Sequence, residues 1–397
     1  MKIHIITSIA FPNGMAPGNR IKCYAGAIAE AGLDCEVIIY RRTERHGVAP
    51  QNTLAEGQVF GVPYRYIGGT PLRGSNKLIR CWHDVCDKQA LKRHLRRHLH
   101  AGDVLFLYAG LDAHYNVALC RLAHRRGCKV VRELCELPFG TTTETSRTAR
   151  LRRYTEQKVF PLCDGIVPIS DALMQYARQY ARPSCRFQKI PILVDYDRYA
   201  LPDRSAESDV PYIFHAGTLY DQKDGILGMI EAFGMARQKL SFPIQLICTG
   251  RKENSRHHKE IEALILKYHL QDALIFTGYL SDDGLKDHLQ RASLVVINKH
   301  PNQQNTYCFS TKLGEYMAAG KAIIITRMGE AMNWLTDGTD ACIVEPDDVT
   351  ALADAMVHLF EDSALRHKLG NGAKETCQSC FDFRTQASVL KTYFESL

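Results

Sequence analysis

A segment whose side chains suit phosphate binding lies in the second half of the chain. It reads YCFSTKLGEYMAAGK over residues 307–321 and follows the apolar run SLVVIN. Ser310 and Thr311 stand where the pattern predicts the start of a helix, whose free N–H groups and positive dipole end attract an anion. Lys312 adds a positive charge, and Glu315 follows one turn later, where a carboxylate can accept hydrogen bonds from a ribose diol. The same pattern is also that of an ordinary capped amphipathic helix, so both interpretations stay open.

A second loop containing glycine and lysine follows another apolar run. The segment HAGTLYDQKDGI covers residues 215–226. Gly217 and Thr218 allow a tight exit from a strand, and Lys223 precedes a predicted helix, so the loop can present N–H groups and an ammonium to a phosphate. It is equally compatible with an ordinary strand–turn–helix connection.

The first half of the chain offers the loop NGMAPGNR at residues 13–20. Gly14 and Gly18 allow close approach of a ligand to the backbone, and Asn19 and Arg20 open a predicted helix. The loop does not fit the GxGxxG pattern, so it does not support dinucleotide binding. We expect it either to contact an acceptor or to be a plain connection.

Alternating apolar runs and amphipathic stretches must position these loops. The alternation predicts an α/β fold with doubly wound parallel sheets covered by helices on both faces. The predicted strands cover residues 3–8, 35–40, 103–108, 128–134 and 165–170, and then residues 212–217, 242–250, 273–279, 293–298, 321–326 and 340–346. The pattern lapses at residues 196–211, which predicts a linker between two Rossmann-like domains. In such sheets ligands bind beyond the carboxyl ends of the strands, so we expect the site in the cleft between the domains.

Composition agrees with two domains and gives them different charges. The chain has 397 residues, 45% of them hydrophobic and 23% charged, which excludes disordered and fibrous proteins. The formal net charge of +7 is uneven, because residues 1–200 hold 30 Lys and Arg against 17 Asp and Glu, whereas residues 201–397 hold 20 against 26. No nucleic-acid-binding motif accompanies the positive charge, so we expect no nucleic-acid partner.

The positive charge concentrates at residues 87–103 and 146–154. In the first stretch Leu91, Leu95 and Leu99 recur every four residues, which predicts a basic amphipathic helix. The basic side chains between the leucines include Lys92, Arg93, Arg96 and Arg97. These charges are either simply solvated or in contact with an anionic membrane surface or a polyanionic acceptor. No window holds the roughly 18 apolar residues that a membrane span needs, so any membrane contact would be peripheral. The 14 cysteines are scattered without a repeating spacing, which is typical of reduced thiols, so we expect a cytoplasmic protein that is either free or peripheral on the inner face of the membrane.

Neither a metal nor a cofactor is expected. Asp195 and Asp197 match the DxD pattern of some metal sites, but they lie where a predicted strand ends and the predicted linker begins. The histidines lack a metal-ligand spacing such as HExxH.

Taken in order, these segments resemble the family 4 glycosyltransferases, a retaining family of the GT-B fold. The resemblance covers nearly the whole chain and rests on the glycine loop after the first strand, SDALMQYA, IPILVD, HAGTLYDQKDG, ICTG, IFTGYLS, STKLGEYMAAGKAIIITRMGE and EPDDVTALADAM. It implies an acceptor-binding domain over residues 1–200, a nucleotide-sugar-binding domain over residues 205–380, and a C-terminal helix at residues 381–397 that crosses back to the first domain.

The resemblance also implies roles for single residues. Lys223 matches the lysine that binds the donor diphosphate, and Glu315 matches the second of two glutamates, the one that holds the ribose. The first glutamate would fall at Tyr307, and the arginine often found after the first glycine of the diphosphate loop is Thr218. Near the base we expect Arg251 and Tyr279, and near the donor sugar Tyr307, Cys308 and Phe309.

The segment VVRELCELPF stands where many members of the family have a strand-end histidine. Glu133 and Glu136 would then lie at the cleft, where either could orient the acceptor hydroxyl or stabilise positive charge on the anomeric carbon. The alternative is a surface carboxylate paired with Arg132 or with a neighbouring helix.

The expected function is therefore metal-independent transfer, with retention, of a sugar from a nucleotide-diphosphate sugar to a hydroxyl acceptor. A UDP-sugar is favoured as donor, and a glycan or lipid-linked glycan as acceptor. Lys223, Ser310, Thr311 and Lys312 would stabilise the leaving diphosphate. Two alternatives are a sugar-nucleotide epimerase of the same fold and a non-catalytic partner that binds nucleotide sugars.

Overall fold

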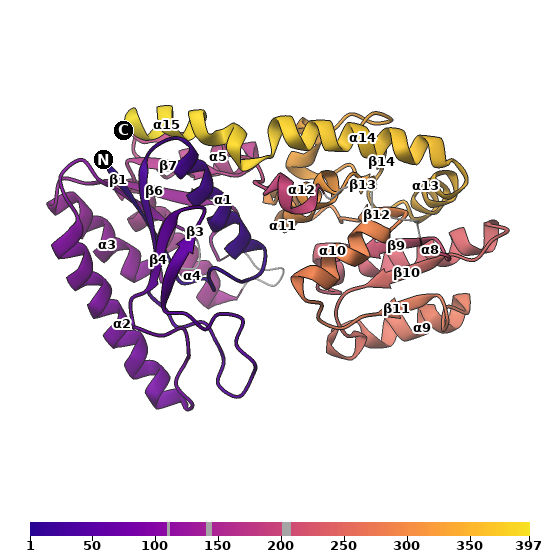
Figure 1. Ribbon diagram of the computed structural model, residues 1–397, viewed down its shortest axis with the longest axis horizontal. Coiled ribbons are helices and arrows are strands. Elements are labelled where there is room, and N and C mark those ends of the chain that lie inside the picture. Colours follow the sequence, from indigo (N-terminus) through magenta and orange to yellow (C-terminus); the bar gives the residue numbers. More distant parts are fainter. Residues whose placement is uncertain (109–111, 140–144, 201–207) are drawn as a thin grey trace. The chain divides into compact units, whose positions relative to one another are not determined.

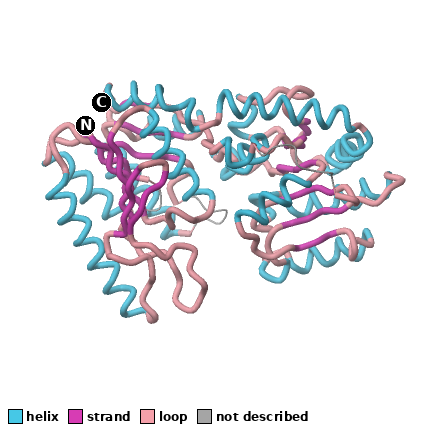
Figure 2. The backbone as a smooth tube through the Cα atoms, in the orientation of Figure 1, coloured by secondary structure: helices cyan, strands magenta, loops and turns pink. Residues whose placement is uncertain are grey.

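The chain forms two compact α/β units in the computed structural model (Figures 1 and 2). The structure describes residues 1–108, 112–139, 145–200 and 208–397. Unit 1 consists of Met1–Val194 and Phe383–Leu397, and unit 2 of Asp195–Asp382. The division thus falls slightly before residue 200, the boundary expected from sequence. Residues 201–207 of the predicted linker lie outside the described residues.

Unit 1 is built on an eight-stranded sheet in the order β3-β4-β2-β1-β5-β6-β7-β8. Its strands are β1 Lys2–Thr7, β2 Asp34–Ile39, β3 Glu56–Val59, β4 Val62–Tyr66, β5 Val104–Leu107, β6 Lys129–Leu134, β7 Gly165–Pro168 and β8 Arg186–Phe187. All neighbours run parallel except β3 and β4, which form an antiparallel hairpin. The central strands are buried on both faces, which is why they read as continuous apolar runs.

Helices cover both faces of this sheet. They are α1 Ala16–Glu30, α2 Lys77–His98, α3 Ala113–Arg125, α4 Ser146–Tyr154, α5 Asp171–Arg178 and α15 Ala387–Glu395. One apolar cluster joins alternate strand residues such as Ile5 and Phe106 to side chains of α1 and α15. The other cluster joins Ile6 and Leu105 to side chains of α2 and α3. The period-2 alternation of the strands therefore sends neighbouring residues to opposite helical layers.

The C-terminal helix belongs to unit 1, although the chain has passed through unit 2 before it. The Phe383 N–H donates to the Val194 carbonyl, and the Tyr393 hydroxyl donates to the Arg186 carbonyl at 3.2 Å. Phe394 is buried against Phe106 of the sheet. Residues 383–397 are therefore an integral part of the first unit.

Unit 2 contains a six-stranded, all-parallel sheet in the order β11-β10-β9-β12-β13-β14. Its strands are β9 Tyr212–His215, β10 Gln245–Cys248, β11 Leu274–Phe276, β12 Leu294–Ile297, β13 Ala322–Thr326 and β14 Cys342–Val344. The first three strands extend the sheet in one direction and the last three in the other. The order reverses between β9 and β12, which makes this point the topological switch of the sheet.

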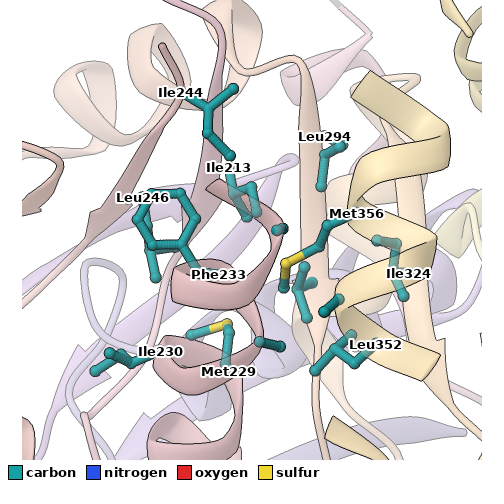
Figure 3. Packing of buried hydrophobic residues seen from close by; sticks show 14 of the residues in the cluster. Ile213, Met229, Ile230, Phe233, Ile244, Leu246, Leu294, Ile324, Leu352 and Met356 are labelled. Carbon is teal, nitrogen blue, oxygen red and sulfur yellow. The ribbon is translucent and has the colours of Figure 1, made fainter. Parts of the chain in front are cut away.

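The helices of unit 2 are α6 Tyr196–Tyr199, α7 Asp221–Asp224, α8 Ile226–Lys239, α9 His258–Tyr268, α10 Asp282–Arg291, α11 Gln303–Tyr307, α12 Thr311–Ala318, α13 Val349–Glu361 and α14 Ser363–Cys380. Figure 3 shows Phe233 of α8 and Met356 of α13 packed with strand residues such as Ile213 and Leu246. The helices α12 and α14 pack together and both contact β13. This core holds the strand ends, and hence the loops that follow them, in fixed positions.

Both sheets confirm the predicted α/β class, but the strands β3, β4 and β8 were not predicted, and the helix α2 begins earlier than expected. The turn of the hairpin β3–β4 uses left-handed backbone at Phe60 and Gly61. The basic helix α2 begins at Lys77, ten residues before the predicted start at Asp87. Its first two turns are largely exposed and lack the leucine spacing that revealed the rest.

In the part of the chain that the structure describes, no helix is both long and apolar enough to cross a membrane. Nor is any group of three or more His, Cys, Asp and Glu side chains among the described residues arranged to hold a metal ion. Asp195 occupies the N-cap position of α6 without a side-chain cap hydrogen bond, and Asp197 lies in the first turn of that helix.

Candidate functional site

The candidate site lies in unit 2, at the carboxyl ends of β9, β10, β11 and β12. The loop after β9 carries Gly217 and Thr218, and the segment after β12 leads through α11 to the start of α12. These two segments flank the switch point of the sheet, where parallel α/β sheets leave a crevice for ligands. Sequence reasoning had selected both segments, although they are about ninety residues apart in the chain.

The Gly217 loop is held in a tight conformation by hydrogen bonds on both sides. The Gly217 N–H donates to Thr249 Oγ1 at 2.9 Å, and the Ala216 N–H donates to the Tyr316 hydroxyl at 2.9 Å. A Cβ atom on residue 217 would lie 2.3 Å from His215 Nε2 and 3.0 Å from Lys312 Nζ. Only glycine fits here, and it leaves the backbone close to a positively charged side chain.

Asp224 and Lys312 form an ion pair beside this loop. Lys312 Nζ lies 2.7 Å from Asp224 Oδ1, and the Asp224 side chain is only 3% exposed. The Thr218 N–H and hydroxyl both donate to Asp224 Oδ2, at 3.3 and 3.2 Å. Burial alone would raise the pKa of the Asp224 carboxyl, but the charges of Lys312 and Lys299 hold it well below its usual range. The carboxylate thus stays ionised and fixes both the lysine and the loop.

A buried histidine lies directly under the loop. His215 is 1% exposed, and its Nε2 atom makes no hydrogen bond among the described residues. Burial, with a contribution from the charge of Lys312, lowers the pKa of His215 to about 4. The imidazole is therefore neutral near pH 7 and adds no positive charge beside Lys312.

The start of α12 supplies backbone donors next to Lys312. The helix begins at Thr311, as the sequence predicts, and Ser310 occupies the N-cap position without making a side-chain cap hydrogen bond. Both residues are partly exposed. Free N–H groups at a helix start, together with a lysine in its first turn, form an arrangement that suits a phosphate.

Glu315 lies one turn into α12, and its neighbours come from α6. Burial raises the pKa of Glu315, while the Tyr199 hydroxyl and the charges of Arg198 and Lys312 act in the opposite direction. Arg198 also pairs with Asp282 at 2.5 Å. Glu315 thus lies close to Lys312 with a carboxylate that can accept hydrogen bonds from a diol.

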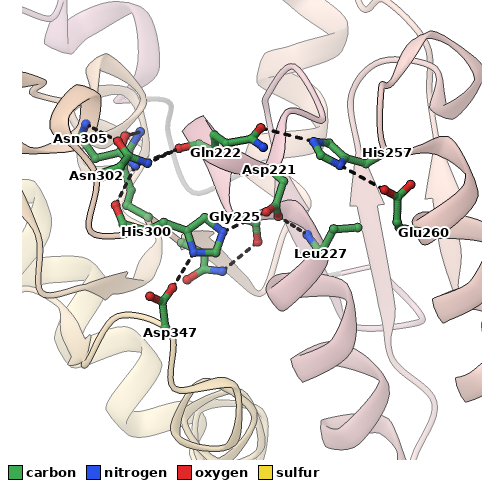
Figure 4. A network of polar contacts seen from close by, with 12 residues as sticks. Asp221, Gln222, Gly225, Leu227, His257, Glu260, His300, Asn302, Asn305 and Asp347 are labelled. Carbon is green, nitrogen blue, oxygen red and sulfur yellow. Dashed lines mark hydrogen bonds and ion pairs between the residues drawn. The ribbon is translucent and has the colours of Figure 1, made fainter. Parts of the chain in front are cut away.

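Lys223 lies in the short helix α7, and a polar network fixes this helix to the chain that follows β12 (Figure 4). The imidazole of His300 links two carboxylates. Its Nε2 atom lies 3.1 Å from Asp221 Oδ2, and its Nδ1 atom lies 2.5 Å from Asp347 Oδ1. The Gln222 carbonyl accepts hydrogen bonds from the side-chain amides of Asn302 and Asn305, at 2.7 and 3.1 Å.

The backbone of Lys223 is also fixed. Its carbonyl accepts a hydrogen bond from Lys299 Nζ at 2.9 Å, and Asn298 Nδ2 donates to the Gly225 carbonyl at 2.8 Å. Gly225 is left-handed, and a Cβ atom there would lie 2.6 Å from Asn298 Nδ2. The network therefore sets the position from which the partly exposed Lys223 side chain extends.

Arg251 and Tyr279 come together at the far side of the same strand ends. Gly250 and Gly278 exchange backbone hydrogen bonds of 2.8 and 3.0 Å, which brings the next residue of each loop to one place. Arg251 Nε lies 3.7 Å from the position that a Cβ on Gly278 would occupy. Tyr279 is 88% exposed, so its ring is available to a planar ligand.

The three residues expected near a donor sugar do not share one environment. Tyr307 ends α11 and Cys308 follows it, both partly exposed. Phe309 is buried, and its ring packs edge-on against Phe381 with centroids 5.7 Å apart. The Phe309 side chain therefore belongs to the core, and only its backbone remains for a ligand.

In unit 1 the structure places Arg20 and Glu133 in the interior. Arg20 Nε donates to Glu133 Oε1 at 2.8 Å, and the remaining guanidinium nitrogens bind the Tyr24 hydroxyl and the carbonyls of Ile190 and Pro191. Burial raises the pKa of Glu133, and Arg20 opposes this shift. Neither side chain reaches the surface, contrary to the expectation that each lines an acceptor site.

The other first-unit candidates lie nearer the surface. Glu136 is exposed two residues beyond the end of β6. A Cβ on Gly14 or Gly18 would lie within 2.8 Å of the Ala10 carbonyl oxygen, so both glycines serve the packing of the first loop. Asn19 is partly exposed at the second turn of α1.

The basic residues expected on α2 lie where the leucine spacing places them. Leu91, Leu95 and Leu99 are buried against the sheet. Arg93, Arg96 and Arg97 are exposed and Lys92 is partly exposed.

Comparison with known proteins agrees with this site. Residues 210–362 match the family model described as glycosyl transferases group 1. This segment contains the glycine loop, the start of α12 and Glu315. This part of the chain therefore resembles the group 1 glycosyltransferases. The two parallel-sheet units of the chain form a GT-B-like architecture, which supports the predicted family 4 membership.

Solved structures share the fold of this chain over its full length. Sucrose-phosphate synthase from Thermosynechococcus elongatus superposes with a TM-score of 0.73 at 17% identity, covering 100% of this chain and 98% of that one. Anabaena Alr3699/HepE in complex with UDP-glucose gives 0.70 at 15% identity, covering 100% of both chains. At these identities the likeness shows the fold alone.

Curated relatives match shorter parts of the chain. N-acetyl-alpha-D-glucosaminyl L-malate synthase of Bacillus anthracis is 21% identical over 58% of this chain and 59% of its own length. The lipopolysaccharide core biosynthesis glycosyltransferase LpsD of Rhizobium meliloti (strain 1021) is 32% identical over 34% of this chain and 37% of its own. The chain thus spans less than two thirds of either relative.

Several residues of the site were not identified as functional from the sequence. Asp224 was seen only as the neighbour of Lys223, and its partner Lys312 is 88 residues away. His215 and Thr249 end or follow apolar strands and resemble core residues in the sequence. A strand-end position was the one signal that could have pointed to them.

Proposed function

We propose that this chain transfers a sugar from a nucleotide-diphosphate sugar, with a UDP-sugar favoured, to a hydroxyl acceptor with retention of configuration. The observation that carries the proposal is the meeting of the Gly217 loop, Lys312 and the uncapped start of α12 at the switch point of unit 2. These groups are donors and cations within one small volume, which is what a diphosphate needs.

The donor would lie across the ends of four strands. The diphosphate would lie between Thr218 and the N–H groups of Ser310 and Thr311, with Lys312 and Lys223 as its cations. Lys312 has three N–H donors and spends one on Asp224, so others remain for phosphate oxygens. Glu315, one turn along α12, would accept hydrogen bonds from the ribose hydroxyls.

The base and the sugar would extend in opposite directions from the phosphates. The exposed ring of Tyr279 and the neighbouring Arg251 suit a planar base. Tyr307 and Cys308, which precede α12, would line the sugar pocket.

Catalysis would rest on stabilising the leaving diphosphate. Negative charge grows on the β-phosphate as the glycosidic bond breaks, and donors that are already in place stabilise it without reorganisation. Lys312, Lys223 and the start of α12 supply this stabilisation from the protein's own groups. A phosphate oxygen of the leaving group would take the proton of the acceptor hydroxyl, in line with retention.

The acceptor would bind to unit 1. This unit carries the excess positive charge, and the exposed Glu136 follows the end of β6 as a candidate to orient the acceptor hydroxyl. The 32% identity to LpsD, a lipopolysaccharide core glycosyltransferase, supports a glycan or lipid-linked glycan as acceptor.

A two-part experiment tests this proposal. Thermal shift of the full chain with UDP, GDP and ADP should give the largest rise in Tm with UDP, because a ligand that binds only the native state stabilises it. Incubation with UDP-sugars and glycan acceptors should then release UDP only when acceptor is present. Epimerised donor without an acceptor would favour the epimerase instead, and no response to any nucleoside diphosphate would contradict the proposal.

A further inference from the structure

His300 joins two carboxylates that come from different parts of unit 2. Its Nε2 atom lies 3.1 Å from Asp221 Oδ2 in α7, and its Nδ1 atom lies 2.5 Å from Asp347 Oδ1 in the turn before α13 (Figure 4). His300 itself follows the end of β12. One imidazole therefore holds three segments of the chain together.

The two contacts of His300 require a proton on each ring nitrogen. A carboxylate only accepts hydrogen bonds, and a neutral imidazole has a single N–H to donate. The imidazolium ion can donate to Asp221 and Asp347 at once. The neutral ring gives up one of these bonds and leaves a nitrogen lone pair facing a carboxylate oxygen, which repels it. The geometry thus suits the charged form of His300.

Charged side chains next to this bridge are engaged elsewhere. The Asp348 carboxylate accepts a hydrogen bond from the Ala351 N–H and so caps α13. Lys299 Nζ donates to the Lys223 carbonyl. These groups are therefore directed to other partners, and the carboxylates at positions 221 and 347 balance the charge of the imidazolium.

The helix α7 depends on contacts from outside because it is only four residues long. A single turn forms too few internal hydrogen bonds to be stable alone. Asp221 opens the helix, and its Oδ1 atom accepts the Leu227 N–H at 2.9 Å, at the start of α8. Asp224 closes the helix and pairs with Lys312. Lys223 lies between these two anchored carboxylates.

We propose that His300 is a positioning residue for the donor: as an imidazolium it fixes α7 through Asp221 and so holds Lys223 in place for the diphosphate. This inference rests on the proposed function and adds a dependence of donor affinity on pH. When His300 loses its proton, one carboxylate contact is lost and α7 gains freedom. Donor binding must then order the helix again, which weakens the affinity. Histidine is the side chain that ordinarily changes its charge between about pH 5 and pH 8.

The other histidines near α7 differ from His300. His215 has a pKa of about 4, so it stays neutral from pH 6 upward. His257 Nε2 lies 3.4 Å from the Gln222 side chain, and its Nδ1 atom lies 3.7 Å from Glu260 in the helix that it precedes. His257 thus contacts α7 without joining it to a second carboxylate, which makes it the matched control.

Titration calorimetry of the full chain with UDP-glucose at pH 6 and pH 8.5 tests the inference. Neither phosphate of UDP-glucose changes its charge in this range, unlike the terminal phosphate of UDP. The original protein should bind UDP-glucose about fivefold more weakly at pH 8.5, which corresponds to one partly exposed ion pair. His257→Gln should show the same dependence.

Two substitutions in the bridge should remove the pH dependence in opposite ways. His300→Gln carries no charge at any pH, so it should bind UDP-glucose weakly at both pH values. Asp347→Asn should bind tightly at both, because an amide can accept from a protonated ring nitrogen or donate to an unprotonated one. Residue 347 has left-handed backbone (φ 62°), which asparagine tolerates well, so this variant should fold normally.

Urea unfolding without ligand gives a second measurement. The difference in unfolding free energy between the original protein and His300→Gln should be larger at pH 6 than at pH 8.5. Equal differences, equal affinity of the original protein at both pH values, or a pH dependence that persists in His300→Gln would each overturn the inference. No binding of UDP-glucose at either pH would instead overturn the proposed function, and this inference with it, so the two failures are distinguishable.

Discussion

Replacement of Lys312 by methionine separates the two tasks of this side chain. In the folded protein Lys312 neutralises Asp224, whose carboxylate is 3% exposed and 2.7 Å away. In the proposed complex the same ammonium also contacts the donor diphosphate. Methionine keeps most of the side-chain volume, so the substitution removes the charge and leaves the packing of α12 nearly unchanged.

The expected loss of stability follows from the burial of Asp224. Removing one partner of a buried ion pair costs about 3–5 kcal/mol. Lys312 is 19% exposed, and Lys299 and Thr218 remain near the carboxylate, so we expect a lower cost of about 2–3 kcal/mol. Loss of one charge-assisted hydrogen bond, about 1.5–3 kcal/mol, should weaken UDP binding about 10- to 150-fold.

The double variant Lys312→Met with Asp224→Asn is the internal control. An amide at position 224 still accepts the Thr218 N–H but carries no charge that needs a partner. The double variant should therefore regain most of the lost stability while its affinity for UDP stays low.

Urea unfolding measures the first quantity and isothermal titration with UDP the second. The reasoning is refuted if Lys312→Met binds UDP as tightly as the original protein. It is also refuted if Asp224→Asn fails to restore the stability of the Lys312→Met variant, because the loss would then have a cause other than the unpaired carboxylate.

Three further substitutions test other parts of the structure. Gly217→Ala places a Cβ 2.3 Å from His215 Nε2, so thermal shift should show lower Tm and little response to UDP, while Gly284→Ala, with no atom nearer than 3.4 Å, should leave both unchanged. His215 is neutral in the fold with a pKa of about 4, so the unfolded chain takes up a proton at this residue first as the pH falls below about 6.5. Between pH 7 and pH 5 the original protein should therefore lose about 2 kcal/mol more unfolding free energy, measured in urea, than His215→Asn. Equal losses in the two proteins would contradict the buried neutral imidazole. Arg20→Met leaves the Glu133 carboxylate buried without its partner and should cost about 3–5 kcal/mol of unfolding free energy, whereas unchanged stability would show that the pair is not formed.

Local patterns in the sequence predicted the central strands and the start of α12 well. Continuous apolar runs occur because the central strands are buried on both faces, and Thr311 begins the helix where the N-capping residue Ser310 indicated. The leucines of α2 are buried as their spacing predicts. Each of these features depends on residues within one or two turns of one another.

Features that depend on distant residues could not be predicted. Glu133 was expected at the surface because it ends a strand, but its burial is decided by Arg20, which is 113 residues away. Phe309 was placed near the sugar by its position in the segment, but its ring packs against Phe381. A sequence shows which residues end a strand, and only the fold shows which way their side chains point.

A structure of the full chain with UDP bound tests the central claim most directly. The account predicts the diphosphate between the Thr218 N–H and the N–H groups at the start of α12, with Lys312 in contact and the ribose hydroxyls on Glu315. A nucleotide bound elsewhere, or a site that stays empty at millimolar UDP, would contradict the assignment of this switch point as the donor site.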